Sequence, residues 1–285
     1  MKKVFFTKMS GAGNDFVLID KDQNKGFSPG KKNVTSICDR RNGIGADGLI
    51  TISKDKNHDF LMEYYNADGS TGSLCGNGAR CAIKFAKTNG LLKNGTAKFL
   101  SNKKEYSGKL LKNNLVKFNL NEPKKIKENF VIEIDNFKIK ASYVDTGSPH
   151  AVIFVEDIFT GNKKAFDNID DIPVFDLGRK LRYSKYFRPK GANINFVDLK
   201  KDNIYIRTYE RGVEDETLAC GTGNAAAALI CNLVKKINPP ITLITKGKDK
   251  LIVDFDTLKG KFVNLSLTGP AKIVFDGEFS FNNLL

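Results

Sequence analysis

Two short stretches of the sequence place a cysteine directly before a glycine-rich turn. They are Cys75-Gly76-Asn77-Gly78 and Cys220-Gly221-Thr222-Gly223, and each runs into an alanine-containing apolar segment that we expect to be helical. A cysteine just before a helix start lies beside unpaired backbone N–H groups and the positive end of the helix dipole, which lowers the pKa of a thiol. Two such thiols in a chain of 285 residues predict one site built from two halves.

Two thiols facing each other across a small substrate are suited to inverting a carbon acid. One cysteine, as the thiolate, removes a proton from one face of the carbon, and the other, as the thiol, returns a proton to the opposite face. The flanking glycines let backbone N–H groups approach a carboxylate, and helix N-termini stabilise the charge that develops as the proton leaves. Because this field does the work of an electron sink, we expect no cofactor.

Metal and nucleophilic chemistry fit the same residues less well. A zinc site needs four ligands at a characteristic spacing, which Cys75 and Cys81 with His58 and His150 do not supply, so we expect no metal. A nucleophilic Cys–His pair through His150 stays open, but acyl transfer does not explain why the cysteine motif is duplicated.

Two further readings of the glycines and cysteines favour structural roles. The run 221–226 formally matches a dinucleotide fingerprint, but no clear strand directly precedes it, and the segment about 20 residues further on, 241–246, holds no acid. We therefore interpret the match as accidental. The remaining cysteines, which we expect to be buried, are Cys38, Cys81 and Cys231.

Composition narrows the class of protein. A hydrophobic content of 41% supports a sizeable core, and an odd count of five cysteines favours reduced thiols over a disulfide framework. The net charge of +14 comes from scattered lysines without a nucleic-acid-binding motif, so we expect no nucleic-acid partner. No segment approaches the roughly 20 apolar residues of a membrane helix. We expect a cytoplasmic protein that binds no membrane.

The rest of the chain must position these motifs. It reads as many short strands with two substantial helices, at about 78–88 and 223–236, and shorter helices near 34–39 and 175–182. This is not the alternating pattern of a doubly wound sheet. We expect the boundary between the halves at the polar run 122–125.

The duplication extends beyond the cysteines. Glu63-Tyr64-Tyr65-Asn66 precedes the first motif much as Arg207-Thr208-Tyr209-Glu210 precedes the second. The run 11–17, which holds Asn14, similarly echoes the run 191–197, which holds Asn193. The repeats predict two pseudo-symmetric α/β domains that close on a central cleft.

Two polar sites allow both structural and functional readings. His150 follows a Gly-Ser-Pro turn, and it is either a structural histidine or a group that tunes the pKa of a nearby thiol. Glu210 and Arg211 are either an exposed charge pair or a clamp in which Arg211 holds a carboxylate and Glu210 an ammonium. Every amino-acid substrate carries these two groups.

The motifs together resemble the diaminopimelate epimerase family along nearly the full length. The matching runs are Lys8-Met9-Ser10-Gly11-Ala12-Gly13-Asn14-Asp15-Phe16, Asn66-Ala67-Asp68-Gly69-Ser70, Cys75-Gly76-Asn77-Gly78-Ala79-Arg80, Tyr209-Glu210-Arg211-Gly212 and Ala219-Cys220-Gly221-Thr222-Gly223. The resemblance implies two α/β domains, each a curved, mainly antiparallel sheet around a central helix, over 1–121 with 270–285 and over 122–269. It also implies epimerisation of LL-diaminopimelate to meso-diaminopimelate by a two-base mechanism, and we expect a homodimer.

The resemblance assigns roles residue by residue. Cys75 and Cys220 are the acid and base, by family convention the donor and the acceptor in one direction. The pKa of these thiols is tuned by His150 and Glu210. The expected substrate-binding residues are Asn14, Asn66, Gly76, Asn77, Ser148, Asn193, Glu210, Arg211, Gly221 and Thr222.

Three positions depart from the pattern of many family members. Ser148 stands where the loop often has Asn, and it keeps a hydrogen-bonding group. Gly48 stands where some members carry a binding Gln and cannot supply that side-chain contact, and Phe275 stands where some members have a Tyr of the dimer contact.

Two alternatives to this family remain. A proline or hydroxyproline racemase of the same fold usually has His where this chain has Asn77, and its compact substrate does not require a distal clamp such as Arg211. A non-catalytic binding module would have no need to retain both cysteines.

Overall fold

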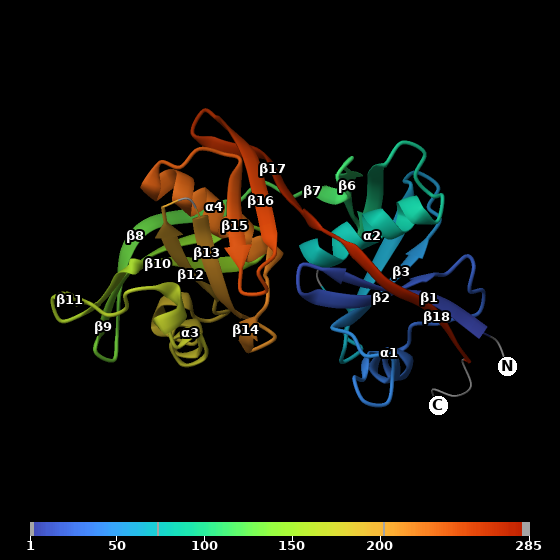
Figure 1. The fold of residues 1–285 in the computed structure, drawn as a ribbon, viewed down its shortest axis with the longest axis horizontal. Coiled ribbons are helices and arrows are strands. Elements are labelled where there is room, and N and C mark those ends of the chain that lie inside the picture. Colours follow the sequence, from blue (N-terminus) through green and yellow to red (C-terminus); the bar gives the residue numbers. More distant parts are fainter. Residues whose placement is uncertain (1–2, 73, 202, 281–285) are drawn as a thin grey trace. The chain divides into compact units, whose positions relative to one another are not determined.

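The computed structural model describes residues 3–72, 74–201 and 203–280 (Figure 1). The chain forms two compact units: unit 1 comprises residues 1–119 and 268–285, and unit 2 comprises residues 120–267. The boundaries expected from the sequence, 121/122 and 269/270, each lie two residues further along the chain. No helix in the described part of the chain is long and apolar enough to cross a membrane.

Unit 1 is a curved sheet wrapped around one buried helix. Its elements are β1 (Lys3–Gly11), β2 (Asn14–Asp20), α1 (Lys31–Cys38), β3 (Gly48–Ser53), β4 (Phe60–Asn66), α2 (Gly76–Thr88), β5 (Thr96–Ser101), β6 (Lys104–Leu110), β7 (Leu115–Asn119) and β18 (Lys272–Ser280). Helix α2 packs against strands β1, β2, β6 and β7, and nearly all residues of its first three turns are buried. A helix that is buried on every side is the centre of its unit.

Unit 2 repeats this plan around helix α4. Its elements are β8 (Lys124–Ile134), β9 (Phe137–Asp145), β10 (Pro149–Thr160), β11 (Lys163–Lys164), η1 (Ile169–Asp171), α3 (Val174–Arg182), η2 (Lys185–Phe187), β12 (Asn193–Lys200), β13 (Asn203–Glu210), β14 (Asp215–Thr217), α4 (Gly221–Lys235), β15 (Ile241–Thr245), β16 (Lys250–Leu258) and β17 (Lys261–Pro270), whose last residues belong to unit 1. Helix α4 packs against β9, β10, β12, β15 and β16.

The strand pairings of the two units follow the same order. In unit 1, β1–β2 is antiparallel, β2–β3 parallel across α1, β3–β4 antiparallel, and β4–β5 parallel across α2. In unit 2, β9–β10 is antiparallel, β10–β12 parallel across α3, β12–β13 antiparallel, and β13–β15 parallel across α4. The predicted fold class, two pseudo-symmetric and mainly antiparallel α/β units, is confirmed.

The strand register corrects one of the expected repeats. Asn14 opens β2, which precedes the crossover helix of unit 1, whereas Asn193 opens β12, which follows the crossover helix of unit 2. In the register, Phe16 pairs with Gly48 and His150 pairs with Asn193. The counterpart of Asn193 is therefore Gly48, and the counterpart of Asn14 is Ser148. The similarity between runs 11–17 and 191–197 misled because it matched residue types between strands of different topological order.

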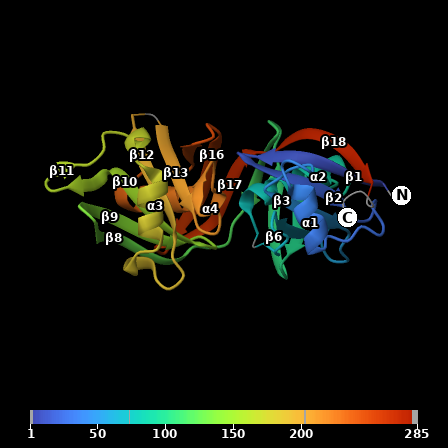
Figure 2. The same cartoon turned by 90° about the horizontal axis from the view of Figure 1, so that it is seen from below.

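Strand β18 joins the end of the chain to its beginning. It runs antiparallel to β1 over almost the whole length of both strands, from Lys3 opposite Ser280 to Ser10 opposite Lys272 (Figure 2). This pairing explains why residues 268–285 belong to unit 1.

Candidate functional site

Each duplicated cysteine is the N-cap residue of the central helix of its unit. Cys75 caps α2 and Cys220 caps α4, so both helices begin two residues earlier than the sequence suggested. The first bonds to the cysteine carbonyls come from Ala79 N (2.8 Å) and Asn224 N (2.9 Å). The backbone N–H groups of the three residues that follow each cysteine lie before this first helical hydrogen bond. Such groups are the ones that a helix N-terminus offers to an anion.

In unit 2, a buried histidine lies next to the residue that follows Cys220-Gly221. His150 Nε2 lies 2.9 Å from Thr222 Oγ1 and 2.9 Å from Ser148 Oγ. Thr222 Oγ1 in turn lies 3.6 Å from Cys220 Sγ, and the cysteine is only 6% exposed. The predicted neighbours His150, Ser148, Thr222 and Cys220 are thus brought together within one unit.

Burial keeps His150 uncharged. The side chain is fully enclosed, and its burial, assisted by the positive charge of Arg211, lowers the pKa of His150 to about 3 from its ordinary value of 6.5. His150 is therefore neutral across the physiological range, and it acts through hydrogen bonds rather than through charge.

The other expected binding side chains of unit 2, those of Asn193, Arg211 and Glu210, are held by hydrogen bonds to backbone or side-chain groups of the same unit. Asn193 Oδ1 accepts from Arg211 N (2.8 Å), and its Nδ2 donates to Pro149 O (2.9 Å). This amide fixes the start of the loop that carries Arg211, whose Nη1 makes a long hydrogen bond (3.4 Å) to Lys190 O. Glu210 Oε2 accepts from Thr217 Oγ1 (3.0 Å).

In unit 1, amide groups lie next to the first cysteine in place of the hydroxyl groups of unit 2. Asn77 Nδ2 donates to Asn14 Oδ1 (2.7 Å), and Asn14 Nδ2 donates to Asp47 Oδ2 (2.9 Å). At the other end, the fully buried Arg80 donates from Nη2 to Asn77 Oδ1 (2.9 Å). A chain of three hydrogen bonds between a cation and an anion therefore fixes both amide orientations.

The anionic end of this chain belongs to a charge cluster. Arg40 Nη2 lies 2.6 Å from Asp47 Oδ1 and 2.8 Å from Asp15 Oδ1, and Lys8 Nζ lies 2.8 Å from Asp15 Oδ2. Partial burial alone would raise the pKa of Asp15, but the hydrogen bonds from Arg40 and Lys8 outweigh it and lower this pKa to about 2. The carboxylate of Asp15 therefore stays ionised at all physiological pH values.

The position of Gly48 is closely packed. A Cβ atom at Gly48 would lie 2.5 Å from Tyr64 Cε2 and 2.6 Å from Tyr65 O. The ring of Tyr64 thus fills the space that a side chain at position 48 would need. This agrees with the expectation that position 48 supplies no side-chain contact to the substrate. Asn66 closes β4 opposite Gly48, and its Nδ2 donates to Ser70 Oγ (3.0 Å).

The remaining thiols are inert. Cys38, Cys81 and Cys231 are buried as predicted, and burial raises the pKa of each to about 12. In the described residues there is no group of three or more His, Cys, Asp or Glu side chains that could hold a metal ion.

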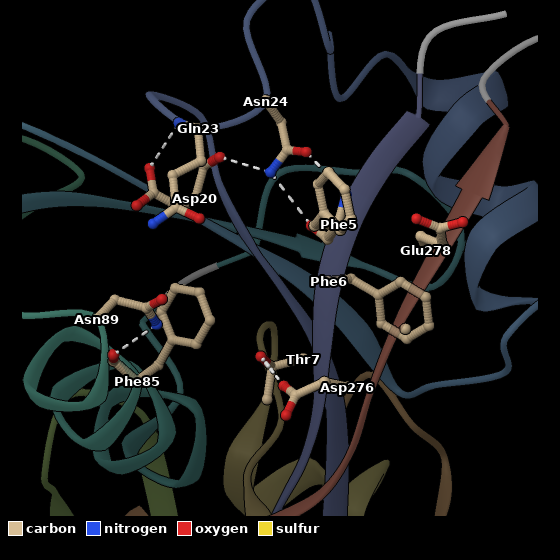
Figure 3. A pocket seen from close by; sticks show the side chains of 11 residues that line it. Phe5, Phe6, Thr7, Asp20, Gln23, Asn24, Phe85, Asn89, Asp276 and Glu278 are labelled. Atoms are coloured by element: carbon tan, nitrogen blue, oxygen red, sulfur yellow. Dashed lines mark hydrogen bonds between the residues drawn. The ribbon is translucent and has the colours of Figure 1, made fainter.

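A cavity of about 430 Å³ in unit 1 lies away from this chemistry (Figure 3). Phe85 and Asn89, at the C-terminal end of α2, line it together with residues of β1 and β18. Cys75 lies at the opposite end of the same 13-residue helix, about 20 Å away at 1.5 Å per residue. The cavity is therefore separate from the cysteine site of unit 1.

Sequence reasoning missed the residues that orient this machinery: Arg40, Asp47, Arg80, Asn195 and Thr208. Asp47 lies in a glycine-rich loop, and Arg80 carries no sequence signal beyond its place in the first cysteine motif. The sequence does indicate a site role for Asn195, because residues two apart on a strand share a face and Asn193 is a candidate binding residue.

Comparison with solved structures identifies the fold. The chain is similar to a phenazine biosynthesis protein of the PhzF family from Bacillus anthracis, with a TM-score of 0.72 and 15% identity over 99% of this chain and 100% of that one. It is also similar to a hydroxyproline epimerase from Agrobacterium vitis, with a TM-score of 0.68 and 12% identity over 98% of this chain and 93% of that one. The protein thus belongs to the structural class that these two proteins share.

Sequence comparison is more specific. The Diaminopimelate epimerase family matches residues 6–126 and 142–274. The diaminopimelate epimerase of Chlorobaculum tepidum is 38% identical over 275 residues, which cover 95% of this chain and 100% of that protein. That of Aquifex aeolicus is 38% identical over 290 residues, which cover 96% and 97%. This chain belongs to the diaminopimelate epimerase family.

Proposed function

We propose that this protein is an isomerase that interconverts LL-2,6-diaminopimelate and meso-2,6-diaminopimelate without a cofactor, and thereby serves lysine and peptidoglycan precursor synthesis. The observation that carries the proposal is the duplicated cysteine N-cap, one on the central helix of each unit, in a chain of this family. Near 38% identity to proteins named diaminopimelate epimerase supports the choice of substrate.

In the proposed mechanism the two cysteines exchange roles. The thiolate of Cys220 takes the α-proton, so that the C–H bond breaks and an S–H bond forms, while the thiol of Cys75 gives its proton to the opposite face of the same carbon. The reverse reaction begins with the thiolate of Cys75. Backbone N–H groups of Gly76-Asn77 and Gly221-Thr222 stabilise the carboxylate as negative charge develops on it.

The rest of the substrate is proposed to bind to the side chains predicted from the sequence. Arg211 pairs with the distal carboxylate, Glu210 with an ammonium group, and Asn14, Asn66 and Asn193 complete the polar lining. The long hydrogen bond from Arg211 to Lys190 O supports this role, since a carboxylate would offer the guanidinium a stronger, bidentate partner.

Replacing either cysteine tests the two-base mechanism. Cys75→Ala and Cys220→Ala should each lower epimerisation by about 10²- to 10⁴-fold, the contribution of one general acid–base group. The measurement follows deuterium uptake from D₂O into LL-diaminopimelate, with L-proline as the alternative substrate. Near wild-type turnover in either variant contradicts the mechanism, and faster exchange of L-proline identifies a racemase instead. Cys231→Ala, which removes an inert thiol, is the control.

We also propose that the enzyme is a cytoplasmic homodimer. Apolar side chains are exposed on the neighbouring strands β1 and β18, where Phe5 is 54%, Val274 58% and Phe275 46% exposed. Large apolar side chains exposed at neighbouring positions of one strand, as Val274 and Phe275 are on β18, support an interaction surface there. Sedimentation should give a dimer for the wild type and a monomer for Phe275→Asp, and a wild-type monomer contradicts the proposal. Cell fractionation tests the location.

A further inference from the structure

The two cysteine sites differ in the residues that the sheet places beneath each helix start. Strand register makes Phe16, Ile50 and Tyr64 of unit 1 equivalent to His150, Asn195 and Thr208 of unit 2. Both sets contact their helix at the second glycine after the cysteine. A Cβ atom at Gly78 would lie 3.0 Å from Ile50 Cδ1, and one at Gly223 would lie 2.4 Å from Asn195 Oδ1.

Unit 2 therefore holds a polar set where unit 1 packs apolar and aromatic groups. His150 and Asn195 are both fully buried, and Thr208 is 3% exposed. Burying polar groups is costly unless all of them are hydrogen-bonded. The polar Asn195 thus occupies a buried strand position whose equivalent in unit 1 carries the apolar Ile50.

The contacts of Asn195 fix the orientation of its amide. Its Nδ2 lies 2.8 Å from Ala151 O, a backbone carbonyl that can only accept, and its Oδ1 lies 3.0 Å from Thr208 Oγ1. Nδ2 must then be the amide nitrogen, and its second hydrogen points at His150 Nδ1, 3.1 Å away. An N–H donor at Nδ1 requires that this nitrogen carry no proton.

A neutral imidazole with an unprotonated Nδ1 carries its proton on Nε2. Nε2 faces the hydroxyl groups of Thr222 and Ser148, each 2.9 Å away. The amide donor Nδ2 of Asn193 lies further from Nε2, at 3.5 Å, and makes its shorter hydrogen bond to Pro149 O, at 2.9 Å. When Thr222 Oγ1 accepts the proton of Nε2–H, its own hydroxyl hydrogen is available for Cys220 Sγ, 3.6 Å away. A hydroxyl donor to sulfur favours the thiolate over the thiol.

We infer that Asn195 is a positioning residue, which holds His150 as the Nε2–H tautomer and so directs the hydroxyl of Thr222 to the sulfur of Cys220. The consequence for the reaction rests on the proposed function, whereas the tautomer itself does not. Gly223 belongs to the same arrangement of residues, because any side chain at this position would displace the amide of Asn195.

The tautomer can be measured directly, because the chain contains only two histidines. In protein labelled with ¹⁵N-histidine, ¹⁵N–¹H correlation spectra distinguish Nδ1–H, Nε2–H and doubly protonated rings. His58 is an internal reference: carboxylates of Asp55 and Glu105 lie at its two nitrogens and raise its pKa. His58→Gln assigns the signals. His150 should show Nε2–H alone, and an Nδ1–H signal overturns the inference.

The Asn195→Asp variant should reverse the tautomer. A carboxylate oxygen in place of Nδ2 accepts a hydrogen bond from Nδ1–H, so Nε2 becomes an acceptor and the hydroxyl of Thr222 turns towards it and away from sulfur. We expect kcat to fall about 100-fold, as for a misplaced catalytic group, with KM changed less than about threefold. An acid limb should also appear in the kcat–pH profile, because the new carboxylate favours protonated His150.

Further variants keep the test decisive. If Asn195→Asp does not fold, Asn195→Ala removes the donor to Nδ1 and should give a mixture of both tautomers. Asn24→Asp is the matched control: Asn24 is a buried asparagine of unit 1 whose Nδ2 also donates to a backbone carbonyl, Asp20 O (2.8 Å). It should lose stability but keep the Nε2–H tautomer and the wild-type kcat.

The outcomes separate the inference from the proposed function. An Nε2–H signal that persists in both Asn195 variants overturns the role of Asn195, whatever the activity. If the tautomer changes as expected but the wild-type protein does not epimerise diaminopimelate, the proposed substrate is wrong and the positioning role of Asn195 stands.

Discussion

The two cysteine sites share a scaffold but orient their polar groups by opposite means. In unit 1, Asn77 and Asn14 lie between the cation of Arg80 and the anion of Asp47. In unit 2, the corresponding Thr222 and Ser148 are oriented by a neutral, buried histidine. A duplicated fold thus preserves the helix start that presents the cysteine, while the strands beneath it are free to diverge.

The two ways of orienting polar groups differ in whether they depend on a protonation state. Fixed charges hold an amide in one orientation without any choice of protonation state, because the donors and acceptors cannot exchange. A neutral imidazole can donate from either nitrogen, so its direction depends on a further group. Unit 1 is therefore sensitive to the loss of a charge, and unit 2 to the position of a single proton.

Asp47→Asn provides the larger of two tests of this contrast. The neutral amide removes the charged acceptor of Asn14 and presents an N–H group to either Asn14 or Arg40. Because hydrogen bonds to charged groups are worth about 1.5–3 kcal/mol, we expect KM for diaminopimelate to rise about tenfold while the His150 tautomer is unchanged. Steady-state kinetics provide the measurement.

The matched control for this variant is Asp135→Asn, which removes the same charge from an exposed pair with Lys180 in unit 2. It should leave KM unchanged. Equal KM values for the two variants would show that Asp47 does not position Asn14.

The dependence of folding stability on acidic pH provides the smaller test of this contrast. His150 has a pKa of about 3 in the folded state against an ordinary 6.5, so between these values the unfolded chain binds more protons and stability falls as pH falls. Asp15, with its pKa at about 2 against 3.8, begins to contribute only below pH 3.8. Of these two groups, only His150 in unit 2 should therefore lower the stability of the protein between pH 6.5 and pH 4.

Urea unfolding at pH 7, 6 and 5 measures this effect. The wild type should lose stability more steeply than His150→Gln, by up to about 1.4 kcal/mol per pH unit, the value for one proton. Parallel curves for the two proteins would mean that His150 is not buried as a neutral group.

The sequence predicted the parts of this molecule that depend on local patterns. The Cys-Gly-X-Gly runs were enough to predict the two central helices to within two residues of their starts, because glycine turns, alanine content and a single cysteine all lie within a dozen residues. The equivalence of Asn66 and Glu210 was also inferred correctly, since the register makes β4 and β13 equivalent strands and each residue is the last one of its strand.

The orienting groups could not be predicted, because they depend on strand register across long connections. Asn195 reaches His150 only because β10 and β12 pair in parallel across α3, and Asp47 reaches Asn14 through the same crossover in unit 1. The match of Asn14 with Asn193 failed for this reason: residue type alone does not reveal on which side of the crossover helix a strand lies.

The return of β18 to β1 has a consequence for synthesis of the chain on the ribosome. β1 is made before unit 2, yet one of its two neighbours, β18, follows unit 2 in the sequence. Unit 2 lies wholly between them in the sequence and can complete its own strands earlier. During translation, one edge of β1 therefore stays open until β18 emerges, and unit 1 is completed only after the whole of unit 2 has been made.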